Sequence, residues 1–70
     1  MFFHKNLNYL TKNTPINQNQ LATKMNINRQ NITKWLDKSE PGYSKLIEIS
    51  KIYNISIDDL LTKDLEESSK

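Results

Sequence analysis

The sequence predicts an all-α fold, a five-helix orthogonal bundle with short links between its helices. Apolar residues recur at spacings of three and four, and no segment shows the two-residue alternation of a half-buried strand. One glycine and two prolines among 70 residues leave few points at which a helix would be interrupted. Three segments also repeat one helix-start pattern. A chain of this length forms one domain with a small core.

The first helix is expected over residues 2–12. Phe3, Leu7 and Leu10 stand at i, i+4 and i+7, which places them on one helix face. Pro15 disfavours a helical conformation in the residue before it, so the helix should end ahead of this proline.

Three later helices should begin with the same arrangement of residues. Each has an Asn or Ser as N-cap, an apolar residue directly before the cap, and a second apolar residue five positions after the first. This is the hydrophobic staple around an N-cap. The segments are Ile16–Leu21, Ile27–Ile32 and Ile55–Leu60, which place helix starts near residues 18, 29 and 57. Gln20 also fits a capping box, and Asp59 is a shorter acidic substitute.

The remaining helix should follow the turn at Pro41-Gly42. Apolar residues recur there at helical spacing, at Leu46, Ile49, Ile52 and Tyr53. Asn54 is expected to end this helix in the left-handed region. The predicted core comprises Leu7, Leu10, Ile16, Leu21, Ala22, Met25, Ile27, Ile32, Trp35, Leu46, Ile49, Ile52, Ile55 and Leu60.

The segment Gln18–Trp35 is the most informative part of the chain. It reads as two short helices joined by a tight turn at Met25-Asn26-Ile27. Ile32 and Trp35 define the inner side of the second helix of this pair. The residues on its outer side are Arg29, Gln30, Thr33 and Lys34.

These outward residue types suit the edges of DNA bases in the major groove. Arg29 matches the O6 and N7 acceptors of guanine, and Gln30 matches N6 and N7 of adenine. Thr33 offers a hydroxyl and a methyl group, and Lys34 can reach a base or a phosphate. Gln18 begins a helix, where free backbone N–H groups favour a phosphate. Further phosphate-binding candidates are Lys12, Asn17, Asn19, Lys38 and Ser39.

Charge is divided unevenly along the chain. Residues 1–38 carry six basic residues against one acid, a net +5, whereas residues 39–70 have a net −3. A basic first half is typical of a protein with a polyanionic partner on one face.

With these residues in place, the chain resembles the lambda-repressor-like family (Cro/repressor-type, XRE-like) of helix-turn-helix proteins. The resemblance runs from about Leu7 to Leu61, and its most telling elements are Gln18 and the Ile32-x-x-Trp35 pair. It implies a DNA-binding domain over residues 1–63, with the helix-turn-helix at about 17–36 and the third helix in the major groove. It also makes Arg29, Gln30, Thr33 and Lys34 the base-reading positions and Gln18 a phosphate clamp.

Three positions depart from the family pattern. The turn has Asn26 where glycine is common, which is tolerable because Asn adopts positive φ better than most residues. Leu36 replaces a usual polar residue and either covers the core's edge or is an exposed apolar contact for a second subunit or another protein. Acidic Asp37 and Glu40 flank Lys38, which weakens the case for a phosphate contact in that loop.

An enzyme is not expected, because the chain has no cysteine, one histidine (His4) and no glycine-rich loop. No cofactor, metal site or membrane span is predicted, and a cytoplasmic location, nucleoid-associated when DNA is bound, follows as the expectation.

The expected function is a sequence-specific transcriptional regulator, a phage-type repressor that binds double-stranded DNA as a homodimer on a two-fold operator. Candidate dimer contacts are Leu36, Ile57, Leu61 and Leu65. Residues 64–70 are expected to form an acidic flexible tail or the start of a linker to a C-terminal domain. An antirepressor-type protein is a further expected partner. The alternative is a protein-interaction module, an antitoxin or regulatory adaptor with the same fold.

Overall fold

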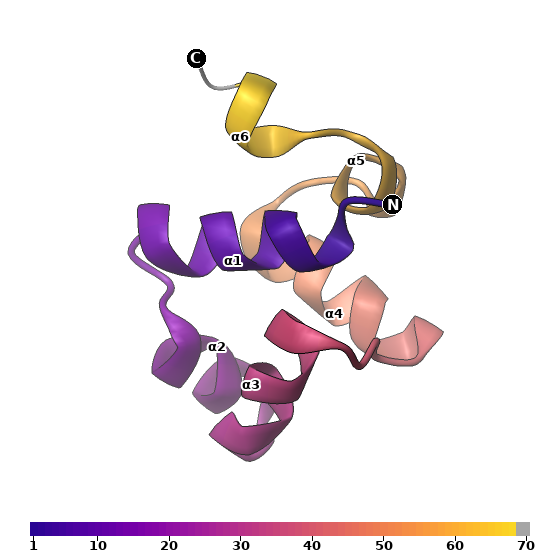
Figure 1. Ribbon diagram of the computed structural model, residues 1–70. Coiled ribbons are helices and arrows are strands. Elements are labelled where there is room, and N and C mark those ends of the chain that lie inside the picture. The colour runs from indigo at the N-terminus through magenta and orange to yellow at the C-terminus, as the bar shows by residue number, and fades with distance from the viewer. Residues whose placement is uncertain (69–70) are drawn as a thin grey trace.

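The computed structural model describes residues 1–68 and is entirely helical over that range apart from turns and links. Figure 1 shows α1 lying between the α2–α3 pair on one side and α5 and α6 on the other. The helices are α1 (Phe3–Asn13), α2 (Gln18–Met25), α3 (Arg29–Asp37), α4 (Tyr43–Tyr53), α5 (Ile57–Thr62) and α6 (Leu65–Ser68). The predicted all-α class is confirmed, with one short helix more than expected.

The three predicted helix starts are confirmed, because each proposed N-cap side chain accepts a backbone N–H. Asn17 forms the full capping box with Gln20. Asn28 accepts from the N–H of Gln30, and Ser56 accepts from the N–H of Asp59. Each cap satisfies a donor that the first helical turn would otherwise leave unpaired.

Two asparagines end helices in the left-handed conformation, as predicted for Asn54. Asn26 has φ 56° and Asn54 has φ 57°. The Asn26 N–H donates to the carbonyls of Ala22 and Thr23, and the Ile27 N–H donates to the Ala22 carbonyl at 3.0 Å. The turn after α2 is therefore closed by the helix's own free carbonyls.

The core follows the predicted apolar faces. All fourteen predicted residues are either buried or packed, half-buried, against the buried cluster. Phe3 was missing from that prediction and is 1% exposed. Ala22, 4% exposed, lies where α2 and α3 pack together, and its small side chain allows the close approach.

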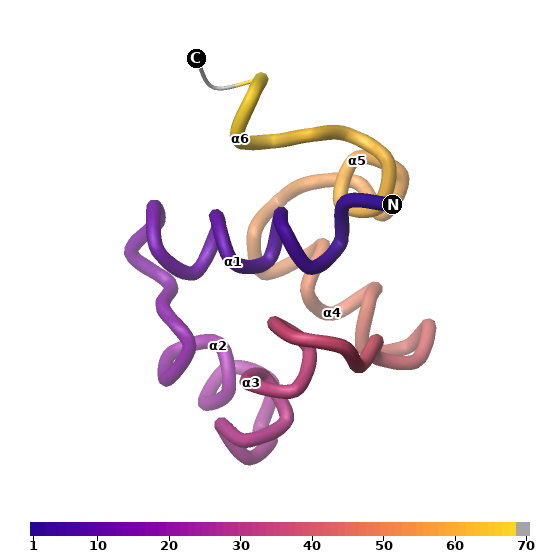
Figure 2. Tube along the Cα trace, viewed as in Figure 1, coloured from indigo at the N-terminus to yellow at the C-terminus, as the bar shows by residue number. Residues whose placement is uncertain are grey.

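A buried asparagine joins the two ends of the described chain. Asn6 is fully buried, and its Nδ2 donates to the carbonyls of Leu60 (2.7 Å) and Lys63 (2.6 Å). Its Oδ1 accepts from the N–H of Leu65 at 3.0 Å. The N–H of Phe2 donates to the carbonyl of Leu61 at 2.8 Å, and Figure 2 shows the N-terminal end of the chain beside α5.

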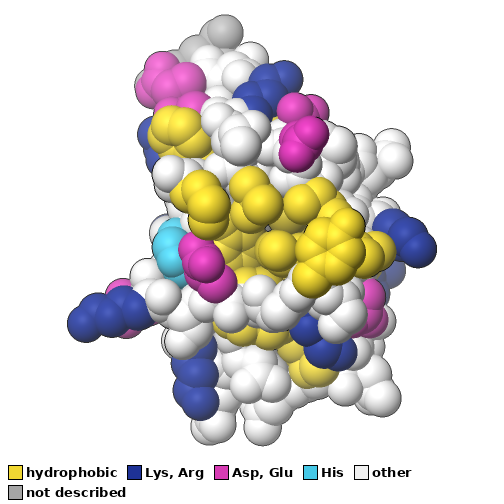
Figure 3. Space-filling view, turned by 90° about the vertical axis from the view of Figure 1, so that its right-hand side faces the viewer, with side chains coloured by type: hydrophobic (Ala, Val, Ile, Leu, Met, Phe, Trp, Pro, Cys, Tyr) yellow, Lys and Arg dark blue, Asp and Glu magenta, His cyan; other side chains and the backbone are white. Residues whose placement is uncertain are grey.

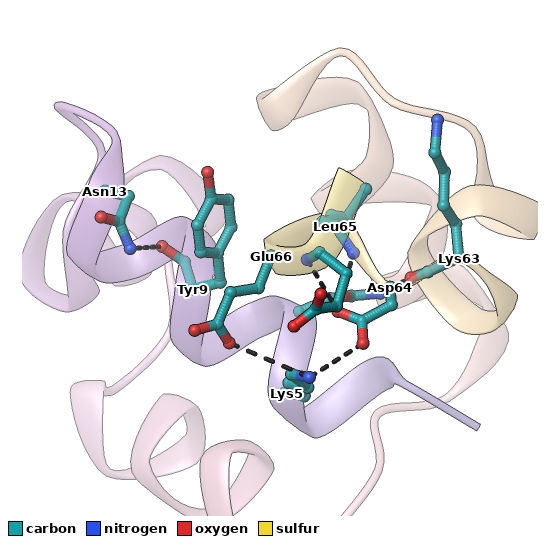
Figure 4. Close-up of polar contacts among 9 residues, drawn as sticks. Lys5, Tyr9, Asn13, Lys63, Asp64, Leu65 and Glu66 are labelled. Carbon is teal, nitrogen blue, oxygen red and sulfur yellow. Dashed lines mark hydrogen bonds and ion pairs between the residues drawn. The ribbon is translucent and has the colours of Figure 1, made fainter. Parts of the chain in front are cut away.

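The structure differs from the predicted tail over residues 64–68. Lys5 Nζ forms an ion pair with Asp64 at 2.8 Å and lies 4.0 Å from Glu66 (Figure 4). Leu65 packs against the core, so α6 buries part of an apolar side chain. Local sequence pattern did not show this because the partners Lys5 and Asn6 lie far away along the chain. The predicted tail residues 69–70 lie outside the described residues.

Candidate nucleic-acid interface

The α3 helix is held rigidly from one side. Ile32 is completely buried and Trp35 is 9% exposed, so the apolar face of α3 is anchored in the core. Nδ1 of His4 donates to the Trp35 carbonyl at 2.7 Å, which ties the last turn of α3 to α1. The opposite face of α3 is consequently fixed in direction as well as exposed.

The four predicted base-reading residues share this exposed face. Within residues 1–68, no protein group forms a hydrogen bond or ion pair with the side chains of Arg29, Gln30 or Lys34. The Thr33 hydroxyl lies 3.4 Å from the Arg29 carbonyl, which leaves its methyl group and lone pairs available. These residues therefore present donors and acceptors that the fold itself does not use.

The start of α2 borders a shallow polar hollow of about 210 Å³. Three of the predicted phosphate-binding residues line it, namely Asn17, Gln18 and Asn19. The side-chain oxygen of Asn17 is occupied by the N-cap. Among the described residues no acceptor binds the backbone N–H groups of Gln18 and Asn19, so both are free at the positive end of the helix dipole.

Arg29 lines the same hollow, from the first turn of α3. Arg29 thus borders the start of α2 as well as lying on the exposed face of α3. Thr11, which the sequence reasoning missed, completes the lining, although its hydroxyl already donates within α1 to Leu7 at 3.0 Å. Its place four residues after Leu7 was the available signal.

The other predicted phosphate-binding residues lie apart from this hollow. Lys12 lines a different one, between α1 and α6, together with Lys5 and Glu66. Lys38 and Ser39 follow α3 and are exposed, but their backbone N–H groups both donate to the Lys34 carbonyl, at 3.2 and 3.1 Å. Only their side chains are therefore available to a ligand.

An apolar area lies on the face that carries the N-terminal end, α5 and the start of α4, where Figure 3 shows hydrophobic side chains gathered together. Of the described large hydrophobic residues, Met1, Phe2 and Tyr43 are the exposed ones. The predicted dimer contacts Leu36, Ile57, Leu61 and Leu65 are all half-buried. Leu36 packs against the core, so it does cover the core's edge.

Residues 1–68 contain no group of three or more His, Cys, Asp or Glu side chains placed to hold a metal ion. Over the same residues, no helix has the length and apolar character needed to cross a bilayer.

Comparison with known protein families identifies the family to which this pair of helices belongs. A helix-turn-helix family model, HTH_3, matches residues 16–60, which is more than half of the chain and includes α2 and α3. Among curated proteins and among solved structures, no significant match was found. The matched family consists of DNA-binding regulators and is typically non-enzymatic. The chain therefore belongs to the HTH_3 family of lambda-repressor-like helix-turn-helix proteins.

Proposed function

We propose that this protein is a sequence-specific transcriptional repressor of the phage type, which binds a two-fold operator as a homodimer. The observation that carries the proposal is the exposed face of α3. Its four outward side chains, Arg29, Gln30, Thr33 and Lys34, are held on a rigid helix and are not used by the fold. Groups that can read base edges and have no internal role suit recognition of DNA.

In the proposed complex α3 lies in the major groove. Arg29 binds guanine through O6 and N7, and Gln30 binds adenine through N6 and N7. Thr33 contacts the methyl group of thymine, while Lys34 reaches a base or an adjacent phosphate. Because the first turn of such a helix enters the groove first, Arg29 and Gln30 carry the greater share of sequence preference.

The start of α2 supplies the backbone contact that sets the register on the duplex. A phosphate oxygen would accept the two free N–H groups at Gln18 and Asn19, next to the Arg29 side chain. The helix dipole favours the anion there. Lys12, Lys38 and Ser39 are second-rank candidates, since the structure places them outside this hollow.

Dimerisation is proposed because one α3 reads only a few bases. Two copies related by a two-fold axis double the contacts and require half-sites roughly 10 bp apart or a multiple of that spacing. Leu36, Ile57, Leu61 and Leu65 are the proposed contacts, together with the apolar face of Figure 3. A dimer covering a promoter would exclude the polymerase and so repress.

The test is selection of bound fragments from a random genomic library, followed by a salt titration on the selected fragment. We expect a preference of about a thousandfold or more over random DNA. We also expect affinity to fall with salt, with a slope near −0.9 for each phosphate neutralised. An inverted repeat in the selected fragments would support the two-fold operator. No preference among fragments, together with a slope near zero, would exclude this function.

A protein-interaction module is the second candidate, favoured by two observations. Acidic Asp37, the last residue of α3, and Glu40, shortly after it, are both exposed and would repel a DNA backbone. Apolar side chains are also exposed at Met1, Phe2 and Tyr43. An antitoxin or adaptor would keep its partner when the α3 side chains Arg29 and Gln30 are replaced by Ala, whereas the proposed repressor would lose its operator.

A further inference from the structure

The segment that leads into α2 is held by two hydroxyl groups, one from α4 and one from the link between α1 and α2. The Tyr53 hydroxyl, at the end of α4, donates to the Ile16 carbonyl at 2.8 Å across 37 positions of sequence. From the other side, the Thr14 hydroxyl donates to the Leu10 carbonyl at 2.6 Å and accepts from the Ile16 N–H at 3.3 Å. Both contacts fix the chain directly ahead of the N-cap.

The contact of Tyr53 acts on a peptide unit that also belongs to the capping box. The carbonyl of Ile16 and the N–H of Asn17 share one planar peptide group. Tyr53 holds the carbonyl, and the side chain of Gln20 accepts the N–H at 3.2 Å. Hydrogen bonds at both edges of this peptide plane oppose its rotation, so the first turn of α2 has a defined direction.

That direction decides where the free backbone donors of α2 point. The N–H of Gln20 is taken by the Asn17 side chain and the N–H of Leu21 by the Asn17 carbonyl. The donors left over are those of Gln18 and Asn19, which border the polar hollow beside Arg29. A small rotation of the peptide group before them would turn both donors away from one phosphate oxygen.

The Tyr53 hydroxyl is suited to a permanent structural hydrogen bond. Burial raises the pKa of Tyr53 to about 12, so its hydroxyl keeps its proton at any ordinary pH. Its ring packs half-buried against the core. Asn54 then turns the chain into the left-handed region directly after it.

We propose that Tyr53 is a positioning residue for DNA binding: its hydrogen bond to Ile16 aims the first turn of α2 at the DNA backbone phosphate. This inference rests on the proposed DNA-binding function, and it assigns to that function a residue of α4, outside the helix-turn-helix itself. Because a phosphate contact carries no sequence information, loss of the hydrogen bond weakens specific and random DNA equally.

The test compares Tyr53→Phe with the control Tyr9→Phe, which removes a hydroxyl that has no hydrogen-bond partner within residues 1–68, from a residue that lines the hollow between α1 and α6. For Tyr53→Phe we expect faster hydrogen exchange of the Gln20 and Leu21 amides and a dissociation constant weakened about threefold to tenfold, the scale of one neutral hydrogen bond. The control should change neither quantity. Urea unfolding is measured in parallel, so that binding is compared only where both variants are folded.

A double-variant cycle separates positioning from general weakening. In a Gln18→Pro background, one of the two free backbone donors is removed at a first helical position that proline tolerates. Tyr53→Phe should cost much less affinity there than in the unaltered chain, because both changes act on one phosphate contact. In a Thr33→Ala background its cost should be undiminished. Thr14→Val releases the same segment from the α1 side and should reproduce the uniform loss, which keeps the test open should Tyr53→Phe fold poorly.

Three results would overturn the inference. One is unchanged affinity of Tyr53→Phe on DNA that the unaltered chain binds. Another is a cost that is fully additive with Gln18→Pro. The third is a loss confined to the selected sequence. If the unaltered chain binds no DNA, the proposed DNA-binding function is itself excluded, and the inference with it.

Discussion

Polar side chains have opposite roles in the two regions that lie on either side of α1. Towards α5 and α6, Asn6 satisfies three backbone groups and Lys5 pairs with Asp64. On the side of α2 and α3, Arg29, Gln30 and Lys34 have no partner within the described residues. A polar group that the fold has satisfied contributes to stability, whereas one left exposed on a rigid element is available to a ligand. Substitutions on the two sides should therefore fail in different assays.

The largest effect should come from the exposed face of α3. Replacing both Arg29 and Gln30 by Ala should cost about 1–3 kcal/mol for each lost base contact on the selected fragment. Folding should be unaffected because neither side chain has a partner in the fold. Fluorescence anisotropy on selected and random DNA measures the loss. Lys51→Ala, which removes a charge from α4, is the control, and an equal loss on both DNAs would argue against base reading.

A smaller effect, seen in a different assay, should follow from Asn6→Ala. The truncation leaves the carbonyls of Leu60 and Lys63 and the N–H of Leu65 without their partner in a buried site. We expect a loss of about 2–3 kcal/mol in the free energy of unfolding, measured in urea. Asn8→Ala, a neighbour on α1 whose side chain the fold does not use, should change stability by less than about 0.5 kcal/mol. Similar losses for the two variants would contradict the role assigned to Asn6.

The smallest effect concerns the pH dependence of the Lys5–Asp64 pair. The hydrogen bond from Lys5 lowers the pKa of Asp64 below its ordinary value of 3.8, so its contribution is present above that pH and is lost as the pH falls through the folded pKa. The hydrogen bond to Asp64 raises the pKa of Lys5 above its ordinary value of 10.5, so its contribution is present below that pH and is lost as the pH rises through the folded pKa.

The measurement is the difference in urea midpoint between the unaltered chain and Asp64→Asn, followed across pH. The difference should be small at neutral pH, because the pair is solvent-exposed, and should shrink at both extremes. High salt should also reduce it. A difference in urea midpoint that grows in acid would show that a group other than the Lys5–Asp64 pair governs how α6 is held.

The sequence predicted those features whose partners lie within one turn of each other. The staple pairs and the caps at Asn17, Asn28 and Ser56 each span five positions or fewer, so their geometry follows from local pattern. The phase of Ile32 and Trp35 likewise predicted the outward face of α3. Nothing local could reveal that Asn6, a polar residue on the apolar stripe of α1, binds α5 and α6 from 54 to 59 positions away.

The positions of the proposed phosphate-binding residues were predicted less completely for the same reason. Asn17, Gln18 and Asn19 do lie together because they are consecutive at one helix start. Whether Lys12 joins them depends on the angle between α1 and α2, which the hydroxyls of Thr14 and Tyr53 set through tertiary contacts. In the sequence, Tyr53 could be recognised only as a member of an apolar helix face.

The hydrogen bonds of Asn6 also bear on the order in which the chain folds. Closing a loop of more than fifty residues costs more entropy than closing the α2–α3 turn, so local contacts are expected to form first. During synthesis, α1 leaves the ribosome before α2 to α6, and its partners at Leu60, Lys63 and Leu65 follow only after more than fifty further residues. The hydrogen bonds of Asn6 are thus completed long after α1 itself has been made, and until then this asparagine is exposed to water.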